Sequence, residues 1–226
     1  MDGHHRLTAA LFIVTLSVLH LVQAQDQSAV FLSLVGFISL DCGLPTNESP
    51  YTEPLTGLNF SSDSDFIQSG KGARVGQDWV YAYKQYNALR YFPDGIRNCY
   101  NLSVKQGINY LIRAGFAYGN YDGLDIYPRF DIYIGPNLWT TVYARFQIDN
   151  EIIHMARSSI LQICLVKTGT TTPFISTLEL RPLRNDSYST QTGSLQHVSR
   201  WFYKNSGDLR YFNSEQFSYM PNSSNI

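Results

Sequence analysis

Asn109-Tyr-Leu-Ile-Arg-Ala-Gly-Phe-Ala-Tyr118 is the stretch of this sequence that decides the fold. Its side chains alternate, with Tyr110, Ile112, Ala114, Phe116 and Tyr118 on one side and Leu111, Arg113, Gly115 and Ala117 on the other. Successive side chains of a strand point to opposite faces of a sheet, so this period of two predicts a half-buried β-strand.

The same period recurs on the C-terminal side of this stretch, at residues 130–135, 161–165 and 177–181. Clusters of Gly, Pro, Asn and Asp, which favour turns, lie before, between and after these segments, at 93–95, 119–123, 135–137 and 169–171. Short alternating strands joined by such turns predict an all-β fold, an antiparallel β-sandwich of the jelly-roll type. Residues 45–76, rich in Ser, Thr, Asp and Gly, are predicted to form a long covering loop with room for one short strand.

The composition fits a folded domain. Of 226 residues, 15% are charged and 14% are aromatic, so the chain has the apolar material for a core and does not resemble a disordered protein. The net charge is −1, which gives no basis for binding nucleic acid or an anionic membrane surface.

The first 24 residues have the pattern of a secretory signal peptide. Basic residues precede an apolar run at 7–22, and Val22-Gln-Ala24 follows as a cleavage site. The run is shorter than the ~20 residues that a membrane-spanning helix needs. A second apolar run at 29–40 is also too short, so we expect a secreted mature chain without a transmembrane span. Residues 25–35 are interpreted as an atypical apolar insertion or linker.

Five Asn-x-Ser sequons would be candidate glycosylation sites in a secreted chain: Asn47, Asn59, Asn101, Asn185 and Asn222. Asn47 is the poorest of them, because Pro50 follows its serine.

The chain has three cysteines, Cys42, Cys99 and Cys164. In an oxidising compartment two of them are expected to pair, while the third is buried or links to a partner. All three pairings stay open at this point. No Cys-x-x-Cys motif and no His/Cys cluster occurs, so neither a metal nor a cofactor is expected.

Several segments together resemble the malectin-like ectodomain of plant leucine-rich-repeat receptor-like kinases. They are Gly36-Phe-Ile-Ser-Leu-Asp-Cys-Gly43, Arg90-Tyr-Phe-Pro-Asp-Gly-Ile-Arg-Asn-Cys-Tyr100, Tyr118-Gly-Asn-Tyr-Asp-Gly123, Phe130-Asp-Ile-Tyr-Ile-Gly-Pro-Asn137, Leu161-Gln-Ile-Cys-Leu-Val-Lys-Thr-Gly169 and Leu178-Glu-Leu-Arg-Pro-Leu183. The resemblance covers roughly residues 36–195 and implies a β-sandwich lobe related to malectin, an animal lectin that binds glucose disaccharides.

In these receptors two such lobes stand in tandem before leucine-rich repeats, a membrane helix and a kinase. Residues 36–195 are therefore interpreted as the first lobe, and residues 196–226 as the truncated start of the second, with an irregular tail. The resemblance implies an apoplastic protein whose full-length relatives lie at the plasma membrane. A truncated paralogue or a partial gene model would explain the missing repeats and kinase.

One loop has the chemistry of a ligand site. Sugars present apolar faces that stack on aromatic rings and hydroxyls that need amide or carboxylate partners, and Tyr118, Asn120, Tyr121, Asp122 and Tyr127 supply both. The competing interpretation is that these tyrosines cap the edge of the sandwich and that the Asp122 carboxylate accepts bonds from turn amides. We therefore predict a non-catalytic recognition module for cell-wall carbohydrate.

Two other functions are weighed against this one. A protein or peptide ligand is the main alternative, with the lobe binding receptor ectodomains or acting as a soluble decoy. A glycoside hydrolase is the remote one, since it needs two close carboxylates. The available acids are Asp122, Asp125 and Asp149 in turn-like polar stretches, Asp131 on the polar side of a strand, and Glu151, so no enzymatic activity is expected.

Overall fold

The computed structural model describes residues 37–144, 146–184, 187–188 and 193–196. The predicted signal peptide, the apolar insertion and nearly all of the predicted second-lobe segment lie outside these residues, as do Asn185 and Asn222. The strands are β1 Ile38–Asp41, β2 Tyr51–Thr52, β3 Asn59–Ser62, β4 Lys71–Arg74, β5 Ala88–Tyr91, β6 Arg97–Ser103, β7 Asn109–Phe116, β8 Arg129–Ile134, β9 Asn137–Tyr143, β10 Ile148–Met155, β11 Ile160–Val166, β12 Phe174–Ile175, β13 Thr177–Pro182 and β14 Ser194–Gln196. Three single-turn 3-10 helices accompany them: η1 Thr46–Glu48, η2 Gln77–Trp79 and η3 Lys84–Tyr86.

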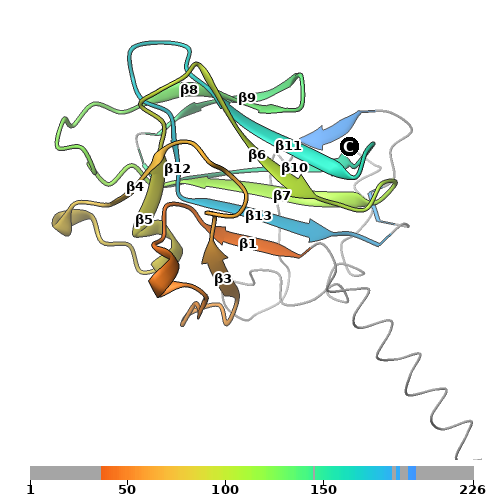
Figure 1. The fold of residues 1–226 in the computed structure, drawn as a ribbon, viewed down its shortest axis with the longest axis horizontal. Helices are drawn as coiled ribbons and strands as arrows, with labels where there is room; N and C mark the ends of the chain where they lie inside the picture. The colour runs from red at the N-terminus through yellow and green to blue at the C-terminus, as the bar shows by residue number, and fades with distance from the viewer. Residues whose placement is uncertain (1–36, 145, 185–186, 189–192, 197–226) are drawn as a thin grey trace, which may run out of the picture. The chain divides into compact units, whose positions relative to one another are not determined.

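Two sheets form the layers of a sandwich (Figure 1). The larger has the strand order β14-β10-β7-β13-β1-β3-β2, and the smaller has the order β6-β11-β8-β9. A third sheet, β12-β5-β4, lies at one end. The predicted antiparallel β-sandwich is confirmed. One pairing differs from the antiparallel rule, because β1 and β3 run parallel.

The core lies between the inward faces of the two layers. From the larger sheet, β7, β13 and β1 contribute fully or almost fully buried side chains such as Ile112, Phe116, Leu178 and Leu40. The smaller sheet contributes the inward residues of β6, β8, β9 and β11, and Trp139 of β9 packs among them. Each fully buried aliphatic or aromatic side chain contributes on the order of 2 kcal/mol of stability.

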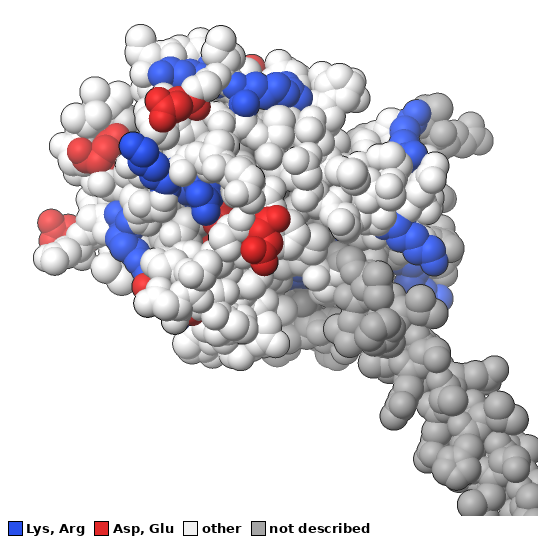
Figure 2. All heavy atoms as spheres, viewed as in Figure 1, with Lys and Arg blue, Asp and Glu red and all other residues white. Residues whose placement is uncertain are grey.

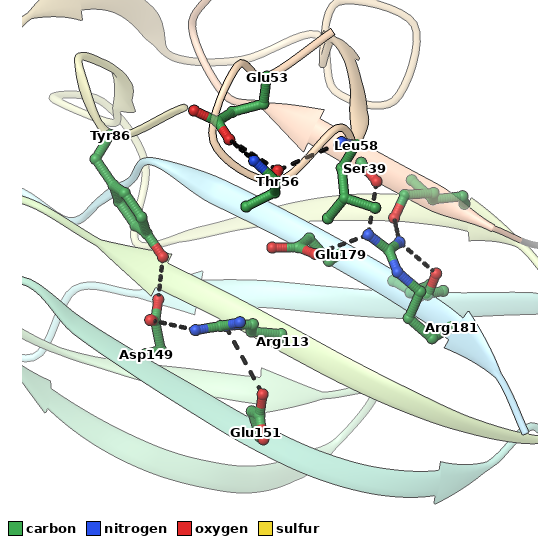
Figure 3. Close-up of polar contacts among 12 residues, drawn as sticks. Ser39, Glu53, Thr56, Leu58, Tyr86, Arg113, Asp149, Glu151, Glu179 and Arg181 are labelled. Atoms are coloured by element: carbon green, nitrogen blue, oxygen red, sulfur yellow. Dashed lines mark hydrogen bonds and ion pairs between the residues drawn. The ribbon is translucent and has the colours of Figure 1, made fainter. Parts of the chain in front are cut away.

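The strand β7 is buried on both of its faces, so the prediction of a half-buried strand is wrong. Its outward residue Arg113 pairs in register with Glu151 of β10 and with Glu179 of β13. The Arg113 guanidinium lies 2.6 Å from the Asp149 carboxylate, which accepts a bond from Tyr86 at 2.6 Å (Figure 3). The ion pair and the hydrogen bond offset part of the cost of burying these charged groups beneath covering segments.

The predicted covering loop at residues 45–76 holds more structure than expected, namely η1, β2, β3 and β4. A fully buried carboxylate, Asp63, ties it to the sandwich. Asp63 accepts hydrogen bonds from the Gly43 backbone at 3.0 Å, from the Arg90 guanidinium at 2.6 and 2.7 Å, and from the Tyr100 hydroxyl at 2.7 Å. These strands are hard to recognise in the sequence because the segment has few apolar residues. Hydrogen bonds to the charged Asp63 side chain help to hold it against the sandwich.

Cys99 and Cys164 form a disulfide between neighbouring strands β6 and β11, and Cys42 is a buried free cysteine. The disulfide settles which of the three open pairings occurs. Within the described part of the chain, no helix has the length and apolar character required to cross a membrane.

Candidate functional site

The connection between β7 and β8, residues 117–128, folds against the segment that follows β4 (Figure 1). The Gly76 backbone amide donates to the Gly119 carbonyl at 2.7 Å. Gly119 has a φ of +48°, and a Cβ built on it would lie 2.5 Å from the Cβ of Val75. Only glycine fits this close approach, so its presence in the turn has a steric reason.

Polar side chains within the same connection hold its shape. The Asp122 carboxylate accepts a short hydrogen bond from the Tyr118 hydroxyl and a second from the Leu124 amide at 3.1 Å. The Asn120 side-chain oxygen accepts from the Asp125 amide at 2.9 Å. The interpretation that Asp122 satisfies turn amides is thus correct, although the residue stays exposed at the surface.

Aromatic side chains from four parts of the chain lie within or beside this connection. We call them the aromatic end, and its members are Trp79, Tyr91, Tyr118, Tyr121, Tyr127 and Phe174. Tyr121 is central, with its ring centroid 5.1 Å from that of Tyr91, 5.6 Å from that of Tyr118 and 6.0 Å from that of Phe174. Tilted and edge-on rings at these distances attract one another beyond the area that they bury.

The five predicted ligand residues differ in their accessibility. Tyr118 is only 3% exposed, so its ring belongs to the core and its hydroxyl positions the Asp122 carboxylate. Asn120, Tyr121 and Tyr127 are half-buried, and Asp122 is exposed. The structure therefore brings all five together but leaves four of them within reach of a ligand.

The two central tyrosines remain protonated hydrogen-bond donors at neutral pH. Burial, with the negative charge of Asp122 adding to it, raises the pKa of both Tyr118 and Tyr121 above the ordinary value of a tyrosine. The Tyr118 proton is already used in its hydrogen bond to Asp122, so of the two it is the Tyr121 phenol that can donate to a ligand oxygen, which a phenolate could not do.

Sequence reasoning missed three aromatic members of this end, Trp79, Tyr91 and Phe174. Tyr91 comes from β5, where it is the register partner of Phe174 in β12. Trp79 comes from η2 and is 41% exposed. The apolar side chains of Val80, Leu124 and Ile126 are also exposed. Nothing in the local pattern around Tyr91 indicates that it lies beside Tyr121, since thirty positions of chain separate them and only the fold joins them.

Three of the carboxylates considered for hydrolysis, Asp131, Asp149 and Glu151, are engaged by other side chains. The expectation that Asp149 lies in a turn-like stretch is wrong, because it lies with Glu151 on β10. Asp149 forms an ion pair with Arg113 at 2.6 Å, and Glu151 lies 3.7 Å from the same guanidinium (Figure 3). Burial alone would lower the pKa of Arg113, but Asp149 and the other nearby acids raise it overall. Asp131 accepts from the Thr141 hydroxyl at 2.6 Å.

Two other kinds of site, a charged surface patch and a metal site, were considered among the described residues. Basic and acidic side chains are interspersed on the face that Figure 2 shows, without a large patch of one sign. Among the residues with described positions, no three His, Cys, Asp or Glu side chains gather as metal ligands would.

Three of the five predicted glycosylation sites, Asn47, Asn59 and Asn101, lie within the described residues, and all three are exposed.

The comparison with known protein families gives a match to the malectin-like domain over residues 40–218. A probable LRR receptor-like serine/threonine-protein kinase of Arabidopsis thaliana is 60% identical over 215 residues. The alignment covers 93% of this chain but 24% of that kinase, so the chain spans about a quarter of the length of this relative.

Solved structures share the fold at low sequence identity. The plant receptor-like kinase FER superposes with a TM-score of 0.59 and 22% identity, over 68% of this chain and 43% of that one. A structure of the plant peptide RALF23 in complex with FER and LLG2 superposes with a TM-score of 0.53 and 17% identity, over 70% of this chain and 42% of that one.

Proposed function

Since this chain belongs to the malectin-like domain family, we propose that it is a non-catalytic extracellular recognition module whose aromatic end binds cell-wall carbohydrate. Its sequence relatives are receptor kinases of which it matches about a quarter, so the kinase activity of those proteins is no part of the proposal. The observation that carries the proposal is the gathering of half-exposed rings and exposed polar groups at one end of the sandwich.

The rings suit the apolar faces of a sugar. Tyr121 is braced by Tyr91 at 5.1 Å and by the buried Tyr118 at 5.6 Å, so its orientation is fixed before a ligand arrives. A preorganised ring binds with a smaller loss of side-chain entropy than a free one. Trp79 offers a second exposed aromatic surface on the neighbouring segment.

The polar groups suit sugar hydroxyls. The Asp122 carboxylate is held by the Tyr118 hydroxyl and the Leu124 amide, and it has further acceptor capacity toward solvent because a carboxylate has about four lone-pair sites. Hydroxyl donors of a sugar can use those sites. A small number of placed polar groups beside apolar rings is the usual composition of a small-molecule site.

A protein or peptide ligand is the second candidate, and two observations favour it. One of the similar solved structures is a complex of the plant peptide RALF23 with FER and LLG2. Around the aromatic end of this chain, Val80 is 69% exposed, Leu124 is 64% exposed and Ile126 is 56% exposed. Exposed apolar side chains close together are typical of protein-binding surfaces.

The test uses the full chain, expressed through a secretory route, on an array of plant cell-wall polysaccharides and oligosaccharides. We expect binding that weakens at least tenfold in Tyr121→Ala, a loss of about 1.4 kcal/mol or more. Asp122→Ala is expected to weaken binding as well, since it removes the acceptor. Tyr133→Ala, on the outward face of the smaller sheet, is the matched control and should bind as the unchanged chain does.

Two results would contradict the carbohydrate proposal. If Tyr121→Ala and Asp122→Ala bind polysaccharide as the unchanged chain does, the sugar is not held at the aromatic end. If the chain binds no glycan but captures a peptide or receptor ectodomain, and Leu124→Ser with Ile126→Ser abolishes that capture, the second candidate holds instead.

A further inference from the structure

We propose that Asn101 is an N-glycosylation site whose glycan covers the outward face of the smaller sheet and leaves the aromatic end free. The proposal rests on the extracellular placement that the proposed function requires, but it does not rest on the ligand.

The sequon Asn101-Leu-Ser103 lies on β6 with its two functional side chains on one face. Asn101 and Ser103 are both exposed, while Leu102 between them is fully buried in the core. The Asn101 side-chain oxygen accepts a hydrogen bond from the Gln162 amide at 3.1 Å. Its Nδ2, the atom to which a glycan is joined, has no hydrogen-bond partner among the described residues, so the folded strand can carry the sugar without losing a contact.

The other described sequons serve this face poorly. In Asn47-Glu-Ser49, the serine hydroxyl accepts a bond from the Ser62 backbone amide at 2.8 Å, and Pro50 follows directly. Asn59 is exposed on β3, which belongs to the larger sheet, so a glycan there would lie on a different layer. Asn101 is the described sequon that can place a glycan over the smaller sheet.

The outward face around Asn101 includes an exposed apolar side chain that a glycan would shield. Gln162 and Ile160 of β11 are the register partners of Asn101 and Ser103, and Ile160 is 58% exposed.

The strand register also fixes how far Asn101 lies from the aromatic end. Val166 of β11 pairs with both Arg97 and Asp131, and Asp131 lies just after the 117–128 connection. Asn101 is four residues along β6 from Arg97, about 13 Å farther from that end.

The strand β6 is an edge of its sheet, and an edge presents unpaired backbone groups that can join another chain. The Asn101 backbone amide donates to the Phe66 carbonyl at 3.3 Å, so one position of this edge is already paired. A bulky hydrophilic glycan beside the remaining positions would hinder pairing with a second copy. The glycan would therefore both cover Ile160 and guard the edge of the sheet.

The experiment compares the full chain with Ser103→Ala and Ser103→Thr, all expressed in plant cells through the secretory route. Ser103→Ala removes the acceptor motif and Ser103→Thr keeps it, while both leave Asn101 and Gln162 in place. Each chain is digested with peptide N-glycosidase in heavy-oxygen water, and the peptide that contains Asn101 is measured by mass spectrometry. We expect labelled aspartate at Asn101 in the unchanged chain and in Ser103→Thr, and unlabelled asparagine in Ser103→Ala.

Size-exclusion chromatography at increasing concentration tests the covering role. Ser103→Ala should self-associate at lower concentration than Ser103→Thr, by roughly tenfold if edge pairing gains about 1.4 kcal/mol. Unmodified Asn101 in the unchanged chain overturns the proposal, whatever the other sequons carry. Equal self-association of the two variants overturns the covering role. If the unchanged chain carries a glycan at Asn101 but binds no polysaccharide, the proposed function is rejected and the glycosylation proposal stands.

Discussion

A single buried acid shows how local environment sets a chemical property in this protein. Asp41 is fully buried on β1, and its carboxylate accepts a hydrogen bond from the Tyr51 hydroxyl at 2.7 Å. Burial raises the pKa of Asp41 from 3.8 to about 7, although the Tyr51 hydrogen bond and the Arg74 charge oppose that rise. The folded chain therefore keeps a proton on Asp41 at pH values where the unfolded chain has lost it.

This raised pKa makes stability depend on pH in a defined direction. Below pH 3.8 the acid is protonated in both states, and between about pH 4 and 7 only the folded state holds the proton, so the free energy of unfolding falls as pH rises. The fall attributable to Asp41 is up to about 4 kcal/mol, since each unit of pKa difference corresponds to about 1.4 kcal/mol. Asp41→Asn, which cannot titrate, should lack it.

Urea unfolding of both chains at a series of pH values between 4 and 7.5 measures this effect. The relevant quantity is the change in the difference between the two free energies of unfolding along the series, because the substitution also changes packing by a pH-independent amount. Parallel curves for the two chains would show that Asp41 titrates at its ordinary value in the folded protein.

At the scale of elements, Gly119 matters more than Gly123 for the position of the β7–β8 connection. Gly119 and Gly123 both have positive φ, but an added Cβ would lie 2.5 Å from Val75 at Gly119 and would meet nothing within 4 Å at Gly123. Gly123→Ala should therefore incur the backbone penalty alone, about 1–2 kcal/mol. Gly119→Ala adds a steric clash that costs about 1–3 kcal/mol more.

The clash also predicts a loss of function, because the connection must move away from Val75 and carry Tyr121 with it. We expect weaker polysaccharide binding in Gly119→Ala than in Gly123→Ala, together with a lower midpoint of thermal unfolding. Thermal melts and array binding of the two variants provide the measurement. Equal binding by both would show that the contact with Val75 does not position the aromatic end.

Much of the element pattern is predictable from the sequence, for a physical reason. A strand with one face in the core shows a period of two, and that signal at residues 130–135, 161–165 and 177–181 predicts β8, β11 and β13. Strands in residues 45–76 escape prediction because apolar residues are few there and hydrogen bonds to Asp63 help to hold the segment. The burial of both faces of β7 is hidden because the polar residue Arg113 lies on the second face, where it forms ion pairs with Asp149 and Glu151.

The candidate site is predictable only in the part that is contiguous in sequence. Tyr118 to Tyr127 form one connection, so their chemistry can be recognised together. Tyr91 and Trp79 join them through pairing of β5 with β12 and through the bond between Gly76 and Gly119. Such contacts between distant segments leave no local pattern. The sequence leaves the cysteine pairing open for the same reason, since it depends on the register of β6 and β11.

At the scale of the whole molecule, the disulfide closes a loop between residues separated by 65 positions. Cross-linking a loop of this length lowers the entropy of the unfolded chain and stabilises the fold by about 4 kcal/mol on the chain-entropy account. Cys99→Ala with Cys164→Ala should therefore lower the free energy of unfolding by about 2–5 kcal/mol. Cys42→Ala removes only a buried sulfur and should cost about 1 kcal/mol.

Thiol chemistry distinguishes this pairing from the two alternatives without any substitution. In the unreduced chain Cys42 is buried and has a pKa that burial raises well above its ordinary value, so a thiol reagent should find no reactive group in the native protein. After denaturation it should find one. Proteolysis of the alkylated, unreduced chain should then yield a linked peptide that contains Cys99 and Cys164, with the alkyl group on Cys42. An alkyl group on Cys99 or Cys164 would instead mean that β6 and β11 are not joined, and the register between them would have to be revised.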